Sequence, residues 1–315
     1  MITTITLNAA VDKSYYMNDF KLDKVNRVKE LLAVPGGKGI NVAKVAHTLG
    51  AQVVASGFLG GVNGQFIHQS LQQLGIISDF AWVKGNSRET IAIIEAGGSS
   101  QTELLEPGPI IDEEAQYKLE NKISELSNGS KVVSFSGSIP RGLPYNIYTR
   151  LIQIAKKHGA ITILDTSGSY LSHGLEGKPD ICKPNLEELE QCLGYRPNGK
   201  YEVVKAAKQL IDKGIKLVIV SMDKEGALAV TNQSAWSISP PHIKVKNTVG
   251  CGDSMVAAIA YYLDRLVSPP TEEDIEKALR LGTATAASNA LHQIAGSIQL
   301  DEVNYFTSMV TLKKL

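Results

Sequence analysis

The sequence is poor in cysteine, with only three in 315 residues. Cys182, Cys192 and Cys251 form no CxxC pair, and an odd number suits reduced thiols better than a disulfide framework. Because reduced thiols are typical of the cytosol, we expect a cytoplasmic protein.

The sequence also lacks long apolar runs and an excess of charge of one sign. No apolar run reaches the roughly 18 residues that suggest a membrane span, and the N-terminus, MITTITLN, has no basic segment followed by a long apolar one. Lys plus Arg and Asp plus Glu both number 32, so the formal net charge is zero. We therefore expect neither nucleic acid nor membrane among its partners.

Several chemical motifs are missing as well. The chain has no GxxxxGK[ST] loop, no GxGxxG after a strand and no GxSxG elbow, which argues against a P-loop enzyme, a dinucleotide oxidoreductase and a serine hydrolase. The six histidines are scattered without metal-ligand spacing.

Short β-branched runs alternate with helical patterns along most of the chain. This alternation predicts an α/β fold, with a mostly parallel central sheet, helices on both faces, and the ligand beyond the carboxyl ends of the strands. The expected strands are 2–7, 53–58, 131–136, 161–165 and 217–221, and the expected helices are 40–49, 64–74, 112–127, 145–158, 201–213, 255–266 and 272–290.

Residues 13–34 and 88–106 interrupt this alternation, and the second segment predicts a hairpin around Gly97-Gly98. We expect both to form a small β lid within a single domain of residues 1–315, able to close on a substrate. An exposed strand edge in such a lid could pair with a second subunit to give a homodimer.

The strongest local signal is NTVGCGDSM, residues 247–255, before an apolar helical pattern. A glycine turn at a helix N-terminus exposes unpaired N–H groups to an anion, and Asp253 in the first turn could accept a proton from a hydroxyl. The alternative is that Asp253 and Ser254 only cap the helix.

A second cluster is PGGKGINVAKVAHTLG, residues 35–50. Gly37 allows the backbone to approach a ligand, Lys38 adds a positive charge, and Asn41 offers donors and acceptors. The alternative is an ordinary glycine turn with a solvated lysine. Asp12 follows the first strand and could bind sugar hydroxyls, or it is a plain turn residue.

Cations and carboxylates recur at other predicted strand ends. Arg27 and Arg88, in the expected lid, could clamp a phosphate or be surface charges. In ICKPNLEELE, residues 181–190, the spacing of Asn185 and Glu188 suits a hydrated Mg²⁺, although Glu188 could simply favour the helix start. SMDKEGA, residues 221–227, could line a nucleotide phosphate or be a plain hairpin.

Together these motifs resemble the PfkB (ribokinase-like) carbohydrate kinase family over essentially the whole chain. In order, the matching stretches are TLNAAVD, GGKGINVAKVAHTLG, GFLGG, SGSIPRGLP, DTSG, KPNLEELE and NTVGCGDS. VNRV near residue 26, Lys38 and Arg88 make the chain most similar to the sugar-phosphate kinases, 1-phosphofructokinase and tagatose-6-phosphate kinase.

The resemblance implies a ribokinase-like fold and an ATP-dependent kinase that converts tagatose 6-phosphate or fructose 1-phosphate to the bisphosphate. It implies Mg²⁺ as a cofactor and leaves a monovalent cation open as another. The roles it assigns are general base for Asp253; anion hole for Gly250, Cys251 and Gly252; sugar binding for Asp12, Gly37, Asn41 and Ser138; phosphate binding for Lys38, Arg27 and Arg88; ATP binding for Lys183, Asn185, Ser221 and Gly226; and Mg²⁺ binding through water for Glu188.

The chain departs from the family pattern at two places that matter. TLNAAVD lacks the proline of the family's TLNPSVD, and Asp223 stands where a glycine is usual, which bears on nucleotide affinity. Two alternatives remain at this point: a ribokinase-like kinase of a free sugar or nucleoside, and a non-catalytic sugar-phosphate sensor.

Overall fold

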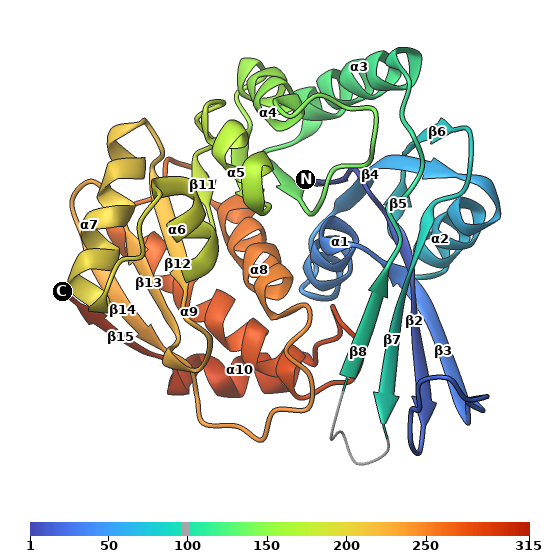
Figure 1. Cartoon of the computed structure of the whole chain (residues 1–315). Helices are drawn as coiled ribbons and strands as arrows, with labels where there is room; N and C mark the ends of the chain where they lie inside the picture. The colour runs from blue at the N-terminus through green and yellow to red at the C-terminus, as the bar shows by residue number, and fades with distance from the viewer. Residues whose placement is uncertain (96–100) are drawn as a thin grey trace.

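The computed structural model describes residues 1–95 and 101–315, and Figure 1 shows a large central sheet with a smaller sheet projecting from one side. The large sheet has 11 strands in the order β15-β14-β13-β12-β11-β10-β9-β1-β4-β5, with β6 paired to β4. Its strands are β1 Ile2–Thr6, β4 Val53–Gly60, β5 Ile77–Ser78, β6 Ala81–Val83, β9 Val132–Ser136, β10 Ile161–Asp165, β11 Ile181–Cys182, β12 Leu217–Ser221, β13 Ala227–Val230, β14 Ala235–Ser239 and β15 Thr311–Lys314.

Most of the large sheet is parallel. Strands β12 to β5 along that order pair in parallel, whereas β13, β14 and β15 extend one edge with antiparallel pairing. The strand order reverses at β1, because the chain first builds toward β4 and later toward β9. By the rule for open α/β sheets, a ligand is expected beyond the carboxyl ends of β1 and β9.

Helices cover both faces of this sheet, as the alternation predicts. In β9, Val132 faces the core beneath α1, α2, α8, α9 and α10, and Val133 faces the core beneath α3 to α7. The helices are α1 Lys38–Thr48, α2 Gly61–Gln73, α3 Glu113–Gly129, α4 Ile147–Lys157, α5 Gly168–Leu175, α6 Leu186–Leu193, α7 Gly199–Asp212, α8 Cys251–Arg265, α9 Glu272–Ala290 and α10 Leu300–Met309. Among the described residues, no helix has the length and apolar character needed to cross a bilayer.

The small sheet has four strands in the order β3-β2-β7-β8. They are β2 Ala10–Met17, β3 Glu30–Gly36, β7 Arg88–Glu95 and β8 Gln101–Leu105, and β2 pairs with β7 in parallel. The turn expected at Gly97-Gly98 lies outside the described residues, although β7 and β8 pair antiparallel on either side of it. The small sheet leads directly into α1 through Gly36 and Gly37.

Candidate active site

The carboxyl ends of neighbouring parallel strands bring opposite charges together. Asp165 is the last residue of β10, and Lys183 follows β11, the adjacent strand. Lys183 Nζ lies 3.2 Å from Asp165 Oδ2, and Lys38 Nζ, from the start of α1, lies 3.0 Å from Asp165 Oδ1. One buried carboxylate therefore holds two lysines in place.

The N-terminus of α8 points at this charged cluster. Gly250 caps the helix at φ 84°, a conformation that favours glycine. A Cβ on Gly252 would lie only 2.9 Å from Lys183 Nζ, so this helix turn packs directly against the lysine. In Figure 1, α8 and α1 lie side by side at the centre of the molecule.

The free amides of this turn differ slightly from those expected. The Cys251 N–H donates to the Thr248 carbonyl oxygen at 3.2 Å, and the Ser254 N–H donates to Gly250. Within the described part of the chain, the N–H groups of Gly250, Gly252 and Asp253 have no hydrogen-bond acceptor, so only Cys251 of the three expected amides is taken. The Gly252 and Asp253 amides, in the first turn of α8, are therefore available to an anion at the positive end of the helix dipole.

Asp253 is buried at the base of the cluster, with 5% of its surface exposed. Asn41 Nδ2 donates to Asp253 Oδ2 at 2.9 Å and fixes the carboxylate. Burial and the nearby Asp165 raise the pKa of Asp253 to about 6, while Lys38, Asn41 and Lys183 oppose that rise. Asp253 is therefore mostly ionised at neutral pH and is a basic carboxylate.

The two lysines keep Asp165 ionised. Burial alone would raise the pKa of Asp165, but Lys183 and Lys38 hold it below its usual value. Asp165 in turn raises the pKa of Lys38, so that this lysine stays charged. The Lys38 side chain is partly exposed, at 39%, whereas the Asp165 carboxylate that its ammonium binds is almost fully buried.

A second group of polar side chains lies where the small sheet meets the large one. The Thr90 hydroxyl donates to Asp12, and a Cβ on Gly36 would collide with the Asp12 carboxylate. Burial raises the pKa of Asp12 against the opposing Thr90 hydrogen bond and the charges of Lys44 and Arg88. Asp12 is therefore held by β7 and β3 at the base of the small sheet.

Arg88 and Ser138 meet through Asn8, which follows β1. Arg88 Nε donates to the Asn8 carbonyl oxygen at 3.1 Å, and Asn8 Nδ2 donates to Ser138 Oγ at 3.3 Å. Arg27 lies apart from these residues, exposed in the segment between β2 and β3. The structure thus joins Arg88 and Ser138 through Asn8 and leaves Arg27 in solvent.

The expected nucleotide-side residues follow β11 and β12. Asn185 and Ser221 form an isolated bridge between the two strand ends. Gly226, at φ 89°, allows the β12–β13 turn to lie against Ile238, because a Cβ there would be 2.0 Å from the Ile238 carbonyl oxygen. Asp223 begins this turn at φ 48°, which explains why glycine is usual at the position.

Asn185 and Glu188 also make a capping box at the start of α6. Asn185 Oδ1 accepts from the Glu188 N–H at 2.7 Å, and Glu188 Oε2 accepts from the Asn185 N–H at 2.9 Å. Glu188 Oε1 has no hydrogen bond in the described chain. This single open carboxylate oxygen fits a hydrated Mg²⁺, which needs few protein ligands.

Three residues that the sequence did not single out contribute to the site. They are Asp165, Lys44, which influences both Asp12 and Asp253, and Asn289, which donates to the Val249 carbonyl oxygen at 2.9 Å. Asp165 ends a predicted strand, and Lys44 lies three residues after Asn41 on the same helical face. The strand end at Asp165 and the helical face shared by Lys44 and Asn41 were the features of the sequence that could have identified these two residues.

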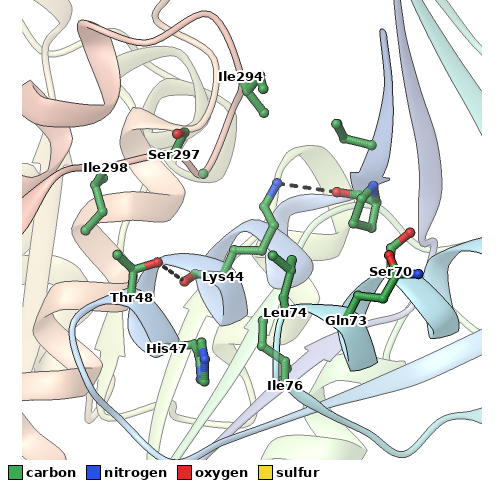
Figure 2. Close-up of a pocket in the computed structure, with 13 residues that line it drawn as sticks. Lys44, His47, Thr48, Ser70, Gln73, Leu74, Ile76, Ile294, Ser297 and Ile298 are labelled. Atoms are coloured by element: carbon green, nitrogen blue, oxygen red, sulfur yellow. Dashed lines mark hydrogen bonds between the residues drawn. The ribbon is translucent and has the colours of Figure 1, made fainter.

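Two cavities are lined by residues other than Asp253. One, of about 360 Å³, lies beside α1 and α2 and is shown in Figure 2, and the other, of about 630 Å³, lies between α7 and α9. Across residues 1–95 and 101–315, no group of three or more His, Cys, Asp and Glu side chains could hold a metal ion.

The chain is similar to known proteins over almost its whole length. The pattern of the pfkB family carbohydrate kinases matches residues 2–300. Tagatose-6-phosphate kinase of Staphylococcus epidermidis strain ATCC 12228 is 41% identical over 305 residues, which cover 96% of each chain.

Solved structures agree with the sequence match. Phosphofructokinase-2 from Escherichia coli in complex with potassium has a TM-score of 0.90 and 29% identity, over 98% of each chain. The same enzyme in complex with fructose-6-phosphate has a TM-score of 0.87 and 26% identity, again over 98% of each chain.

Proposed function

This chain belongs to the pfkB family of carbohydrate kinases and is an ATP-dependent carbohydrate kinase, and we propose that its substrate is a ketohexose monophosphate. The product is then the bisphosphate. The name of the curated relatives favours tagatose 6-phosphate, with fructose 1-phosphate as the alternative. The observation that carries the chemistry is the basic Asp253 carboxylate, fixed by Asn41 next to two free amides of α8.

In the proposed mechanism, Asp253 accepts the proton of the attacking sugar hydroxyl. The γ-phosphoryl group passes from ATP to that oxygen in line. The Gly252 and Asp253 amides, with the α8 dipole, stabilise the negative charge on the transferred group.

The lysines divide into distinct roles. Lys38 was expected to bind the phosphate already on the sugar. However, it forms an ion pair with Asp165 and its charge lowers the pKa of Asp253, so it lies near the proposed base. We therefore assign Lys38 and Lys183 to the phosphoryl group in transfer. This assignment leaves Arg88 as the cationic residue for the sugar's own phosphate, since Arg27 lies apart from it in solvent.

The remaining residues near the strand ends are assigned to the sugar, the nucleotide or the metal. Asp12, Gly37, Asn41 and Ser138 bind the sugar, and Asn185, Ser221 and Gly226 line the nucleotide. Glu188 would hold Mg²⁺ through water, where the ion would neutralise charge on the ATP phosphates.

An assay of ADP release tests this function directly. It compares tagatose 6-phosphate, fructose 1-phosphate and fructose 6-phosphate with free fructose, free ribose and a nucleoside. We expect kcat/KM to be highest for a ketohexose monophosphate, because Arg88 has no ligand on a free sugar. Equal use of unphosphorylated fructose or ribose would overturn the assignment, and a potassium titration in the same assay tests activation by a monovalent cation.

Matched variants test the division of cationic roles. Arg88→Met should raise KM for the sugar phosphate with little change for ATP, whereas Lys38→Met should lower kcat. The reverse pattern would return Lys38 to the substrate's phosphate.

A further inference from the structure

Lys44 is a lysine of α1 whose side chain is largely enclosed and whose ammonium binds two backbone carbonyls. Lys44 Nζ donates to the Ala295 carbonyl oxygen at 2.8 Å and to the Pro35 carbonyl oxygen at 3.4 Å. Figure 2 shows it extending from α1 between residues of α2 and its end, such as Leu74, and the segment of Ile294. No carboxylate of the described residues lies within 4.0 Å of this ammonium.

The two carbonyls belong to separate parts of the molecule. Pro35 lies in β3 of the small sheet, one residue before Gly36, against which the Asp12 carboxylate packs. Ala295 lies in the segment between α9 and α10. Lys44 therefore links the sheet that carries Asp12 to a loop on the other side of α1.

That loop braces the glycine turn of α8. The Gly296 N–H donates to Asn289 Oδ1 at 2.8 Å, and Asn289 Nδ2 donates to the Val249 carbonyl oxygen at 2.9 Å. Val249 directly precedes Gly250, the cap of α8. A continuous series of hydrogen bonds thus runs from β3 through Lys44 to the turn with the free amides.

These contacts leave little room for displacement. A Cβ on Gly296 would lie 2.7 Å from Lys44 Cε, and a Cβ on Gly250 would lie 2.9 Å from the Gly296 nitrogen. Glycine at both positions lets the three segments touch. A shift of the Lys44 ammonium would therefore be passed to the α8 turn.

We propose that Lys44 is a positioning residue for phosphoryl transfer, which fixes the sugar-binding sheet and the Gly250 turn in one arrangement. Without its ammonium, the two carbonyls lose their shared donor, and the sugar hydroxyl and the free amides of α8 are no longer held at the distance that transfer requires. This inference rests on the proposed function, because it presumes that Asp12 holds the sugar.

The charge of Lys44 gives the proposal a second readout. Burial lowers the pKa of Lys44 to about 8, against the opposing fields of Asp12 on β2 and Asp253 on α8. His47 is the other titratable group lining the cavity beside it. As the pH rises through about 8, Lys44 loses its charge, while Asp253, with its pKa of about 6, stays ionised.

The test compares Lys44→Met and Lys44→Arg with the wild type. Methionine keeps the length of the side chain without its charge or donors, and we expect kcat to fall roughly 100-fold, as for a displacement of about 1 Å at a reacting centre. KM for ATP should stay the same, and arginine should restore part of kcat and retain it above pH 8. Lys156→Met is the matched control, because Lys156 also donates to a backbone carbonyl, that of Lys178.

A double-mutant cycle with Asn289→Ser separates positioning from general stability. If both residues act through one series of contacts, the double variant loses much less kcat than the product of the two single losses. Independent losses, or a lowered Tm with unchanged kcat in Lys44→Met, would overturn the proposal. If the wild type used only another sugar, the proposed function would fail, and the same comparison on that sugar would still decide the role of Lys44.

Discussion

The proton affinity of Asp253 depends on a balance between opposing neighbours. Burial and Asp165 raise its pKa to about 6, and Lys38 and Asn41 act in the other direction. Because the base must be ionised, kcat should rise with pH through about 6 and then level off. Lys38→Met should move this acidic limb to higher pH, since it removes a lowering charge, whereas Lys38→Arg should not. A pH profile of kcat measures both, and an unmoved limb in Lys38→Met would contradict the coupling.

Asp253→Asn should separate activity from stability. We expect kcat to fall by about 10²- to 10⁴-fold with little change in KM, because only proton removal is lost. Yet the Tm at pH 7 should be equal or higher, since ionising this buried carboxylate costs roughly 3 kcal/mol at most.

The pH dependence of that Tm difference has a defined sign. The folded-state pKa of Asp253 is raised, so the folded protein takes up the proton first as the pH falls from about 6 toward 3.8. The advantage of the variant should therefore shrink over this interval, as thermal melts can show. Near-full turnover in the variant would end the assignment of Asp253 as the base.

Asp223 allows backbone strain and charge to be tested separately. Its φ of 48° costs a non-glycine residue roughly 1 kcal/mol, and its exposed carboxylate follows the strand that leads to the proposed nucleotide site. Asp223→Gly should therefore raise Tm, and both Asp223→Gly and Asp223→Asn should lower KM for ATP if the carboxylate repels its phosphates. Unchanged KM in both variants would show that the charge points away.

Among secondary-structure elements, α6 has in its first turn a residue with two roles: Glu188 completes the capping box that stabilises the helix and is the proposed Mg²⁺ ligand through water. Glu188→Gln should keep the capping box, because a glutamine oxygen can also accept from the Asn185 N–H. We expect the free energy of unfolding to change by less than about 1 kcal/mol, so that the Tm stays nearly the same. The Mg²⁺ concentration for half-maximal activity should rise.

The capping box of α9 supplies the control for this variant. Thr271 and Asp274 make the same reciprocal hydrogen bonds at the start of that helix. Asp274→Asn should leave the Mg²⁺ dependence unchanged, and an unchanged dependence in Glu188→Gln would remove Glu188 from the metal site.

The sequence predicted the elements whose periodicity is set by burial on one or both faces. The expected strand 161–165 is β10 to the residue, and helix 272–290 is α9. It did not predict β13 to β15, which form an antiparallel edge, because short apolar stretches such as AWSIS carry no sign of their partners. Helices α5 and α10 were not predicted either, because 8 and 10 residues are too few to show a clear helical periodicity.

Motifs singled out Asp253 and Lys38 as candidates, and the structure places both within the electrostatic influence of Asp165. Asp165 was not identified, because a carboxylate at the end of a strand resembles an ordinary turn residue until its two lysines are placed beside it. The role of Lys44 depends on carbonyl groups of Pro35 and Ala295, and backbone carbonyls have no side-chain identity to read.

For the whole molecule, the small sheet offers a surface for self-association. By their register, Leu31 of β3 and Leu104 of β8 lie on the same face, and they are 55% and 53% exposed. We propose that a homodimer forms through this sheet, so Leu31→Lys with Leu104→Lys should lower the mass measured by light scattering to that of a monomer. Val267→Lys, at a fully exposed apolar residue elsewhere, is the control; a wild type that is monomeric at all concentrations would refute the dimer.

The hydrogen bond from Asn41 to Asp253 joins positions 212 residues apart in the chain. Under the proposed mechanism, a nascent polypeptide is therefore inactive until Asp253 has left the ribosome and α8 has docked against α1. Because the two residues are so far apart in the chain, the protein could be divided into two fragments, for instance in the exposed connection between α6 and α7. Neither fragment alone should be active. Restored ATP consumption would then report that the fragments had been brought together.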